Sequence, residues 1–239
     1  MILALAALTA FIAAAIQRIT GIGFVLVFLG PIVLLYGAYE GPTLAIMMAL
    51  VAAAAAIPLV WRDIEWKRSL WLIVPGLLFA PLGSLIVHHL PSGWLMVVTA
   101  ALAFFALVAA YIPALAQHLQ GRRGAVIAGS AAGLMHVTAG LSGPPVASYA
   151  VGDKWDQRRF AASIQLIFVV FSAVSIALRG WPTESAATLW TLVGATALGI
   201  VAGSLLNKFV PKNVARTLML ILAWAGAIVL LVRGLIAIF

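Results

Sequence analysis

The stretch Gln17-Arg18-Ile19-Thr20-Gly21-Ile22-Gly23-Phe24 interrupts an apolar run that extends from Ile2 to Tyr36. The run is about 35 residues long, whereas one membrane crossing needs roughly 20. Its middle carries a permanent cation, an amide, a hydroxyl and two glycines. An ionisable side chain inside the bilayer is costly and points to a functional site, and glycines beside it are typical of a broken helix. The stretch therefore predicts a helical segment that breaks at a polar point within the membrane.

A second stretch of this kind, Met135-His136-Val137-Thr138-Ala139-Gly140-Leu141-Ser142-Gly143-Pro144-Pro145, lies in the other half of the chain. Further along, Gly203-Ser204-Leu205-Leu206 repeats Gly83-Ser84-Leu85-Ile86 at an offset of 120 positions. Self-similarity at half the chain length indicates an internal duplication. We predict one repeat over residues 1–119 and a second over residues 120–239.

Composition places the protein in the membrane. Of its 239 residues, 65% are hydrophobic and 8% are charged, whereas soluble domains carry about 25% charged residues. We therefore predict an all-α, polytopic membrane protein. The net charge of +8 comes from basic residues in short loops between apolar runs, so we expect no nucleic-acid partner. The absence of cysteine excludes disulfides and thiolate chemistry, and the start of the chain lacks the basic segment of a cleaved signal peptide.

The distribution of Lys and Arg predicts the topology. If residues 125–151 enter the membrane and return to the same side, eleven basic residues share one side, Arg179 and Arg233 lie on the other, and Arg18 lies inside the membrane. A single crossing would divide them almost evenly, so the positive-inside rule favours a re-entrant hairpin or two short crossings. Each half then has a broken or re-entrant hairpin plus three transmembrane helices, about eight membrane segments in all. Three crossings per half invert the second copy, which predicts two inverted repeats with both termini outside.

Two inverted breaks would bring helix N-termini together near the membrane midplane. Such N-termini bind anions through free N–H groups and the helix dipole. Hydroxyl groups and a fixed cation nearby suit an anion with several acceptor oxygens. The residues that we predict to bind the substrate are Gln17, Arg18, Thr20, Gly21, Gly23, His136, Thr138, Gly140, Ser142, Gly143 and Gln165.

Several of these residues have a structural alternative. Arg18 could cap the carbonyl groups of a broken helix, and Gln17 could satisfy backbone groups freed by the break. His136 could bind the anion when protonated or carry a coupling proton; alternatively, it is a neutral histidine bonded to a loop carbonyl. Gln165 could bond to a neighbouring helix. Because the acidic residues all fall in loops, and because no Walker loop or metal-ligand cluster occurs, we expect no enzyme activity, no cofactor and no metal.

These motifs resemble the sulfite exporter TauE/SafE family, also called the toluene sulfonate uptake permease group. The resemblance covers essentially the whole chain. It rests on three features: residues 17–24 with Pro31, residues 138–145, and the Gly-Ser-Leu helices that end at Leu90-Pro91 and Val210-Pro211.

The resemblance implies a multi-pass protein of the bacterial inner membrane. It implies secondary transport of a small anion, namely sulfite, a sulfonate or a related organosulfur or organic oxyanion. The alternative function is that of an anion-binding membrane subunit or receptor that does not transport. The expected partners are the small anionic substrate, the lipid bilayer, a proton or a sodium ion as coupling ion, and a second copy of the chain in a homodimer.

Overall fold

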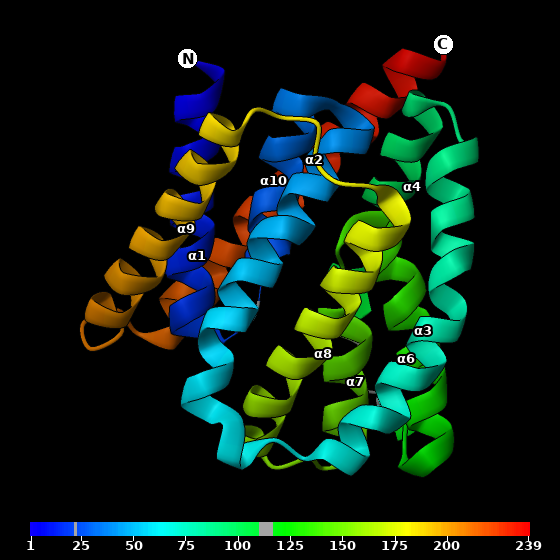
Figure 1. Ribbon diagram of the computed structural model, residues 1–239, viewed down its shortest axis with the longest axis vertical. Coiled ribbons are helices and arrows are strands. Elements are labelled where there is room, and N and C mark those ends of the chain that lie inside the picture. The colour runs from blue at the N-terminus through cyan, green and yellow to red at the C-terminus, as the bar shows by residue number, and fades with distance from the viewer. Residues whose placement is uncertain (22, 110–116) are drawn as a thin grey trace.

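The protein is a bundle of membrane-length helices (Figure 1). The computed structural model describes residues 1–21, 23–109 and 117–239, and these residues contain no strand. Seven described helices are long and apolar enough to cross a membrane, which confirms the all-α, polytopic class. The elements are α1 (Ile2–Thr20), α2 (Phe24–Val60), the 3-10 helix η1 (Trp61–Asp63), α3 (Trp66–His89), α4 (Ser92–Ala109), α6 (Gly121–Ala139), α7 (Gly143–Gly152), α8 (Gln157–Arg179), α9 (Ala186–Leu206) and α10 (Lys212–Ile238).

The predicted hairpin over residues 125–151 is formed by α6 and α7. Its two ends meet, because the Gly121 N–H donates to Asp153 Oδ1 at 2.8 Å. The segment thus enters and leaves at one end of the molecule. At its tip, Gly140 adopts a left-handed conformation with φ 75° and its N–H caps the carbonyl of His136. Glycine takes this conformation without the steric cost that a Cβ would bring.

The first break has a similar construction. Helix α1 ends at Gly21 with φ 87°, and α2 begins after Gly23 with φ 108°. Helix α2 is interrupted once, at Gly37, whose φ of 87° and ψ of 173° are not helical. From the sequence, we expect a turn over residues 37–42 and a helix that begins near Thr43. The helix instead resumes directly after Gly37 and includes Pro42, whose missing N–H leaves the carbonyl of Ala38 without its helical donor.

Helices pair across the two predicted repeats. Helix α3 packs along α6 and α1 along α9, while α4 packs on α10 and α2 on α8. Exchanging the two halves converts the first pair into the second and leaves the other two pairs unchanged. This pattern is the one that an inverted duplication would give, and the inverted repeat remains a prediction. At the α3–α6 contact, a Cβ on Gly133 would stand 2.5 Å from the carbonyl carbon of Gly76, so only glycine permits this approach.

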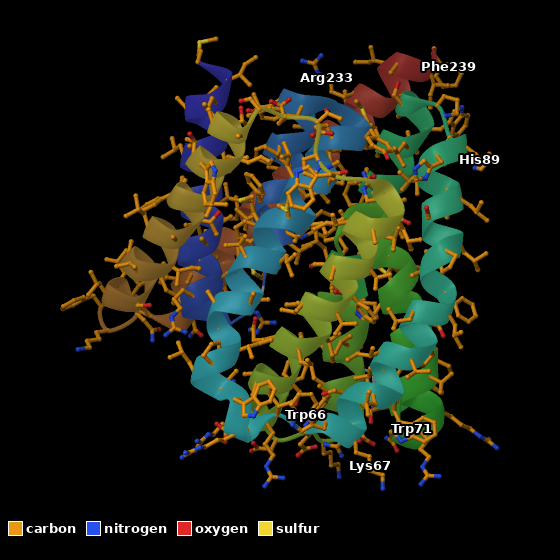
Figure 2. All side chains as sticks on the ribbon, viewed as in Figure 1. Trp66, Lys67, Trp71, His89, Arg233 and Phe239 are labelled. Atoms are coloured by element: carbon orange, nitrogen blue, oxygen red, sulfur yellow. The ribbon has the colours of Figure 1, made fainter. Side chains whose placement is uncertain are left out.

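The two ends of the bundle differ in charge. Both termini lie at one end (Figure 1), and Figure 2 shows His89, Arg233 and Phe239 there. Trp66, Lys67 and Trp71 lie at the opposite end. This opposite end, which we call the basic end, holds an ion-pair network among Asp63, Glu65, Arg68, Asp153, Arg158 and Arg159, with N···O distances of 2.9–3.2 Å.

Candidate functional site

A cavity of about 530 Å³ lies where the two helix breaks meet. Its walls come from α1, α2, α4, α6, α7, α8 and α10. The deep end is formed by His136, Gly140 and Leu141, which are all buried. Val151 and Arg216, which also line the cavity, are exposed. The cavity is therefore closed beside the α6–α7 tip and opens between the end of α7 and the start of α10.

Two helix N-termini line this cavity. Helix α2 contributes its start at Phe24 together with Gly23, and α7 contributes its start at Gly143. First-turn N–H groups have no partner within their own helix, and both dipoles place partial positive charge at these ends. Pro144 follows directly on α7 and lacks an N–H, so α2 offers the richer set of backbone donors. The arrangement attracts an anion to the deep half of the cavity.

His136 is the titratable group at the deep end. Its side chain is 1% exposed. Its Nδ1 lies 2.7 Å from Ser142 Oγ, and its Nε2 lies 3.0 Å from Ser172 Oγ. A hydroxyl can donate or accept, so both serines can satisfy a neutral imidazole in either tautomer. Ser142 thus lies behind the cavity wall and orients His136.

Gln17 and Thr20 reach the cavity from the end of α1. The Thr20 hydroxyl donates to the carbonyl of Ile16 at 2.8 Å. The Gln17 Oε1 atom is buried and has no hydrogen-bond partner among the described residues. A buried acceptor without a partner is rare in proteins and indicates a place for a water or a ligand. This amide therefore offers the cavity an unused acceptor.

The structure brings six of the predicted binding residues to the cavity wall. These are Gln17, Thr20, Gly23, His136, Gly140 and Gly143.

The other five predicted residues lie outside the wall. Arg18 is exposed and donates from Nε to Ser204 Oγ of α9 at 2.8 Å. Gly21 caps α1, and Ser142 supports His136. The Thr138 hydroxyl donates to Leu134 O at 2.9 Å. Gln165 is half-buried on α8.

The sequence prediction did not include the polar residues that α7 and α10 add to the wall. These residues are Ser148, Asn213 and Arg216. Arg216 carries the only full positive charge among the described lining residues and forms no ion pair with a described carboxylate. The sequence contains a sign that Arg216 is unusual. It lies about one turn after the N-cap Pro211, where the helix dipole disfavours a positive charge.

The chain is similar to a known family of membrane proteins. A protein-family model described as sulfite exporter TauE/SafE matches residues 6–230. This range includes every described residue of the cavity wall. None of the curated proteins and none of the solved structures matches the chain.

Proposed function

The chain belongs to the sulfite exporter TauE/SafE family, and from this premise we propose that it is a secondary transporter that binds sulfite or a small sulfonate in the cavity. Family membership and the seven apolar spans make it a multi-pass protein of the bacterial inner membrane. The family is one of transporters of sulfur-containing anions. The observation that best supports the proposed site is the convergence of two helix N-termini and Arg216 on one cavity.

The cavity suits an oxyanion in its charge and in its size. Backbone N–H groups at Gly23 and Phe24 would donate to sulfonyl oxygens. Thr20 and His136 would donate to the anion only on giving up their present contacts with Ile16 O and with Ser142 and Ser172. Arg216 would attract the anion to the mouth. Pockets for organic ligands measure roughly 300–1,000 Å³, and the volume of about 530 Å³ exceeds the need of sulfite alone. An organic sulfonate therefore belongs to the proposed substrate class.

The proposal extends to coupling and assembly. Since the sequence has no Walker loop, we propose that an ion gradient drives transport, with a proton or a sodium ion as the coupling ion. We propose a homodimer as the assembly. The remaining predicted residues, Arg18, Gly21, Thr138, Ser142 and Gln165, would shape the site without lining it in this conformation.

Reconstitution tests the proposal. The purified protein is placed in liposomes preloaded with unlabelled sulfite, and the entry of radiolabelled sulfite is measured by counterflow. We expect entry above that of empty liposomes and competition by methanesulfonate. A non-transporting anion receptor would bind both anions in a thermal-shift assay, since a ligand of the folded state stabilises it, yet would give no counterflow. That result would reject the transporter in favour of the receptor.

A further inference from the structure

Arg179, the last residue of α8, is the largest fully buried side chain in the described part of the protein. It is 2% exposed. Its Nε donates to Thr43 Oγ1 at 2.9 Å, and one terminal nitrogen donates to the carbonyls of Val137 and Thr138 at 2.8 and 3.2 Å. The other terminal nitrogen donates to Tyr39 O at 2.6 Å. All of these acceptors are neutral.

No described carboxylate lies within ion-pair distance of Arg179. Glu40, beside Tyr39 in the chain, instead accepts the Thr183 N–H at 2.7 Å. Part of the compensation comes from the C-terminal end of α6, where the dipole is negative, and part from the face of the Tyr39 ring, whose centroid lies 5.2 Å from Arg179 Cζ. A buried cation held only by neutral groups is an expensive way to cap a helix. The retained positive charge therefore points to an anion as its partner in another state of the protein.

The contacts of Arg179 continue to the surface at the end of the molecule that carries both termini. The Tyr39 hydroxyl donates to the carbonyl of Arg179 and lies 3.3 Å from His88 Nε2. The Ser84 hydroxyl donates to the carbonyl of Leu178 at 3.3 Å. These contacts connect α2, α3, α6 and α8. We call this set, which consists of Arg179, Tyr39, Thr43, Ser84 and His88, the outer cluster.

The outer cluster lies directly beyond the closed end of the cavity. Val137 and Thr138, whose carbonyls bind Arg179, follow His136 of the cavity wall in the chain. Along α8, Ser172 bonds to His136, and Ser175 and Arg179 follow at helical spacing of three and four residues, so all three share one face. The rise of 1.5 Å per residue places Arg179 about 10 Å from Ser172 along the helix.

We propose that the outer cluster is the outer gate of the transport pathway and that Arg179 becomes a ligand of the anion when this gate opens. The inference rests on the proposed function, because a transporter must open the closed end of its cavity to the other side of the membrane. Opening would separate the guanidinium from Thr43 and the carbonyls of α6. The planar guanidinium then offers paired donors that match two oxygens of a sulfite or sulfonate. The anion replaces the lost acceptors, so its binding favours the open gate.

A cysteine reporter tests the gate. The native chain has no cysteine, so Ser175→Cys provides a single thiol between the gate and the cavity. The Ser175 hydroxyl is buried and has no partner among the described residues, so the change removes no described hydrogen bond. Thr196→Cys on α9 is the matched control reporter, since Thr196 is equally buried and unpartnered. A membrane-impermeant methanethiosulfonate is added outside right-side-out vesicles, and the labelling rate is measured.

Arg179→Gln should speed the labelling of the Ser175→Cys reporter by about tenfold, which corresponds to about 1.4 kcal/mol. Arg233→Gln removes an exposed arginine at the same end and should leave the rate unchanged. The milder Thr43→Val removes one hydrogen bond of Arg179 and keeps the guanidinium, so it should raise the rate by a smaller factor. It also keeps the test decisive if Arg179→Gln does not fold. Unchanged labelling in the folded variants, or equal acceleration at Thr196→Cys, would overturn the gate.

Protection by methanesulfonate tests the ligand role, because sulfite itself would react with the methanethiosulfonate reagent. External methanesulfonate should slow the labelling of Ser175→Cys in the Thr43→Val background, where the gate is weakened and Arg179 is present. It should give no protection in the Arg179→Gln background. Equal protection in both backgrounds would overturn the role of Arg179 as a ligand. The labelling rates without added anion do not depend on the substrate, so they test the gate even if counterflow rejects sulfite transport.

Discussion

Removing the charge of Arg216 should weaken anion binding at the cavity mouth. The expected size follows from Coulomb's law: two unit charges 4 Å apart interact by about 1 kcal/mol in water and by about 4 kcal/mol at an effective dielectric constant of 20. Arg216 lines the cavity but is exposed, so the lower part of this range applies. We expect Arg216→Gln to weaken methanesulfonate binding by roughly 1–2 kcal/mol, or about 5- to 30-fold.

Isothermal titration calorimetry in detergent measures this change directly. Methanesulfonate stays ionised near neutral pH, so its own protonation does not contribute. Arg216→Lys keeps the charge and should retain most of the affinity. Lys208→Gln removes a positive charge from the α9–α10 turn, outside the described cavity wall, and is the control for a general loss of charge. Raising the salt concentration should reduce the difference between wild type and Arg216→Gln, because exposed charges are screened within about 10 Å at 0.1 M.

Arg18 provides the decisive comparison. The sequence predicts Arg18 as a ligand, whereas its guanidinium bonds to Ser204 outside the cavity wall. If Arg216 is the cation that acts on the bound anion, Arg18→Gln should weaken binding less than Arg216→Gln does. A large loss of affinity for Arg18→Gln together with normal affinity for Arg216→Gln would refute this reasoning. It would indicate that the anion binds at the end of α1.

Three further predictions concern stability and topology. Gly133→Ala should lower the melting temperature by several degrees, because overpacking against the backbone of α3 costs typically 1–3 kcal/mol. The control Gly194→Ala, whose added Cβ meets open space, should leave the melting temperature unchanged. Equal melting temperatures of the two variants would contradict the close contact of Gly133 with α3. Asp153→Ala removes the acceptor of Arg68, of Tyr149 and of the α6 N-terminus, so we expect a similar fall in melting temperature, and an unchanged value would show that these bonds do not stabilise the hairpin. A single cysteine at Glu184 should react with an impermeant reagent from outside and one at Lys154 should not; outside labelling at Lys154 would exclude the re-entrant hairpin.

The fold was largely predictable because its signals are local or simple. A polar break within an apolar run, glycines at the break and the count of Lys and Arg were sufficient to predict both hairpins. Gly140 shows why: only glycine takes the left-handed turn cheaply, so the residue type itself marks the end of α6. The predicted start of the helix after Gly37 was less accurate, since Pro42 suggested a turn, whereas the structure places this proline inside the helix. The sequence also predicts a helix from Trp94 to about Leu115, and that predicted end falls on residues 110–116, outside the described residues.

The site was predictable only in part, because side-chain direction depends on how helices rotate against one another. Gln17 and Arg18 are neighbours, yet a step of 100° around α1 turns one toward the cavity and the other toward Ser204. No periodicity in this segment distinguishes them, since α1 is apolar on all sides. Arg216 joins the cavity from a distant helix, and such a contact requires the tertiary arrangement.

Arg179 shows that the position of a residue along the chain does not determine whether its side chain is buried. Its place at the end of an apolar helix made it part of an outside loop in the topology count, and the end of α8 lies toward the same end of the molecule as both termini (Figure 1). Its side chain, however, turns inward and is 2% exposed. Loop counting depends on which end of a helix a residue occupies, whereas burial depends on the contacts of that residue with α2 and α6.

The distribution of carboxylates explains where the net charge of +8 acts. Asp63, Glu65 and Asp153 take part in all four described ion pairs, and all lie at the basic end. Arg68 of α3 and Arg158 and Arg159 of α8 are thus paired with carboxylates. Around the α9–α10 turn, by contrast, Lys208 and Arg216 form no ion pair with a described carboxylate. The positive charge beside the cavity mouth is therefore not offset by a described ion pair, so it would raise the local anion concentration and the rate of association.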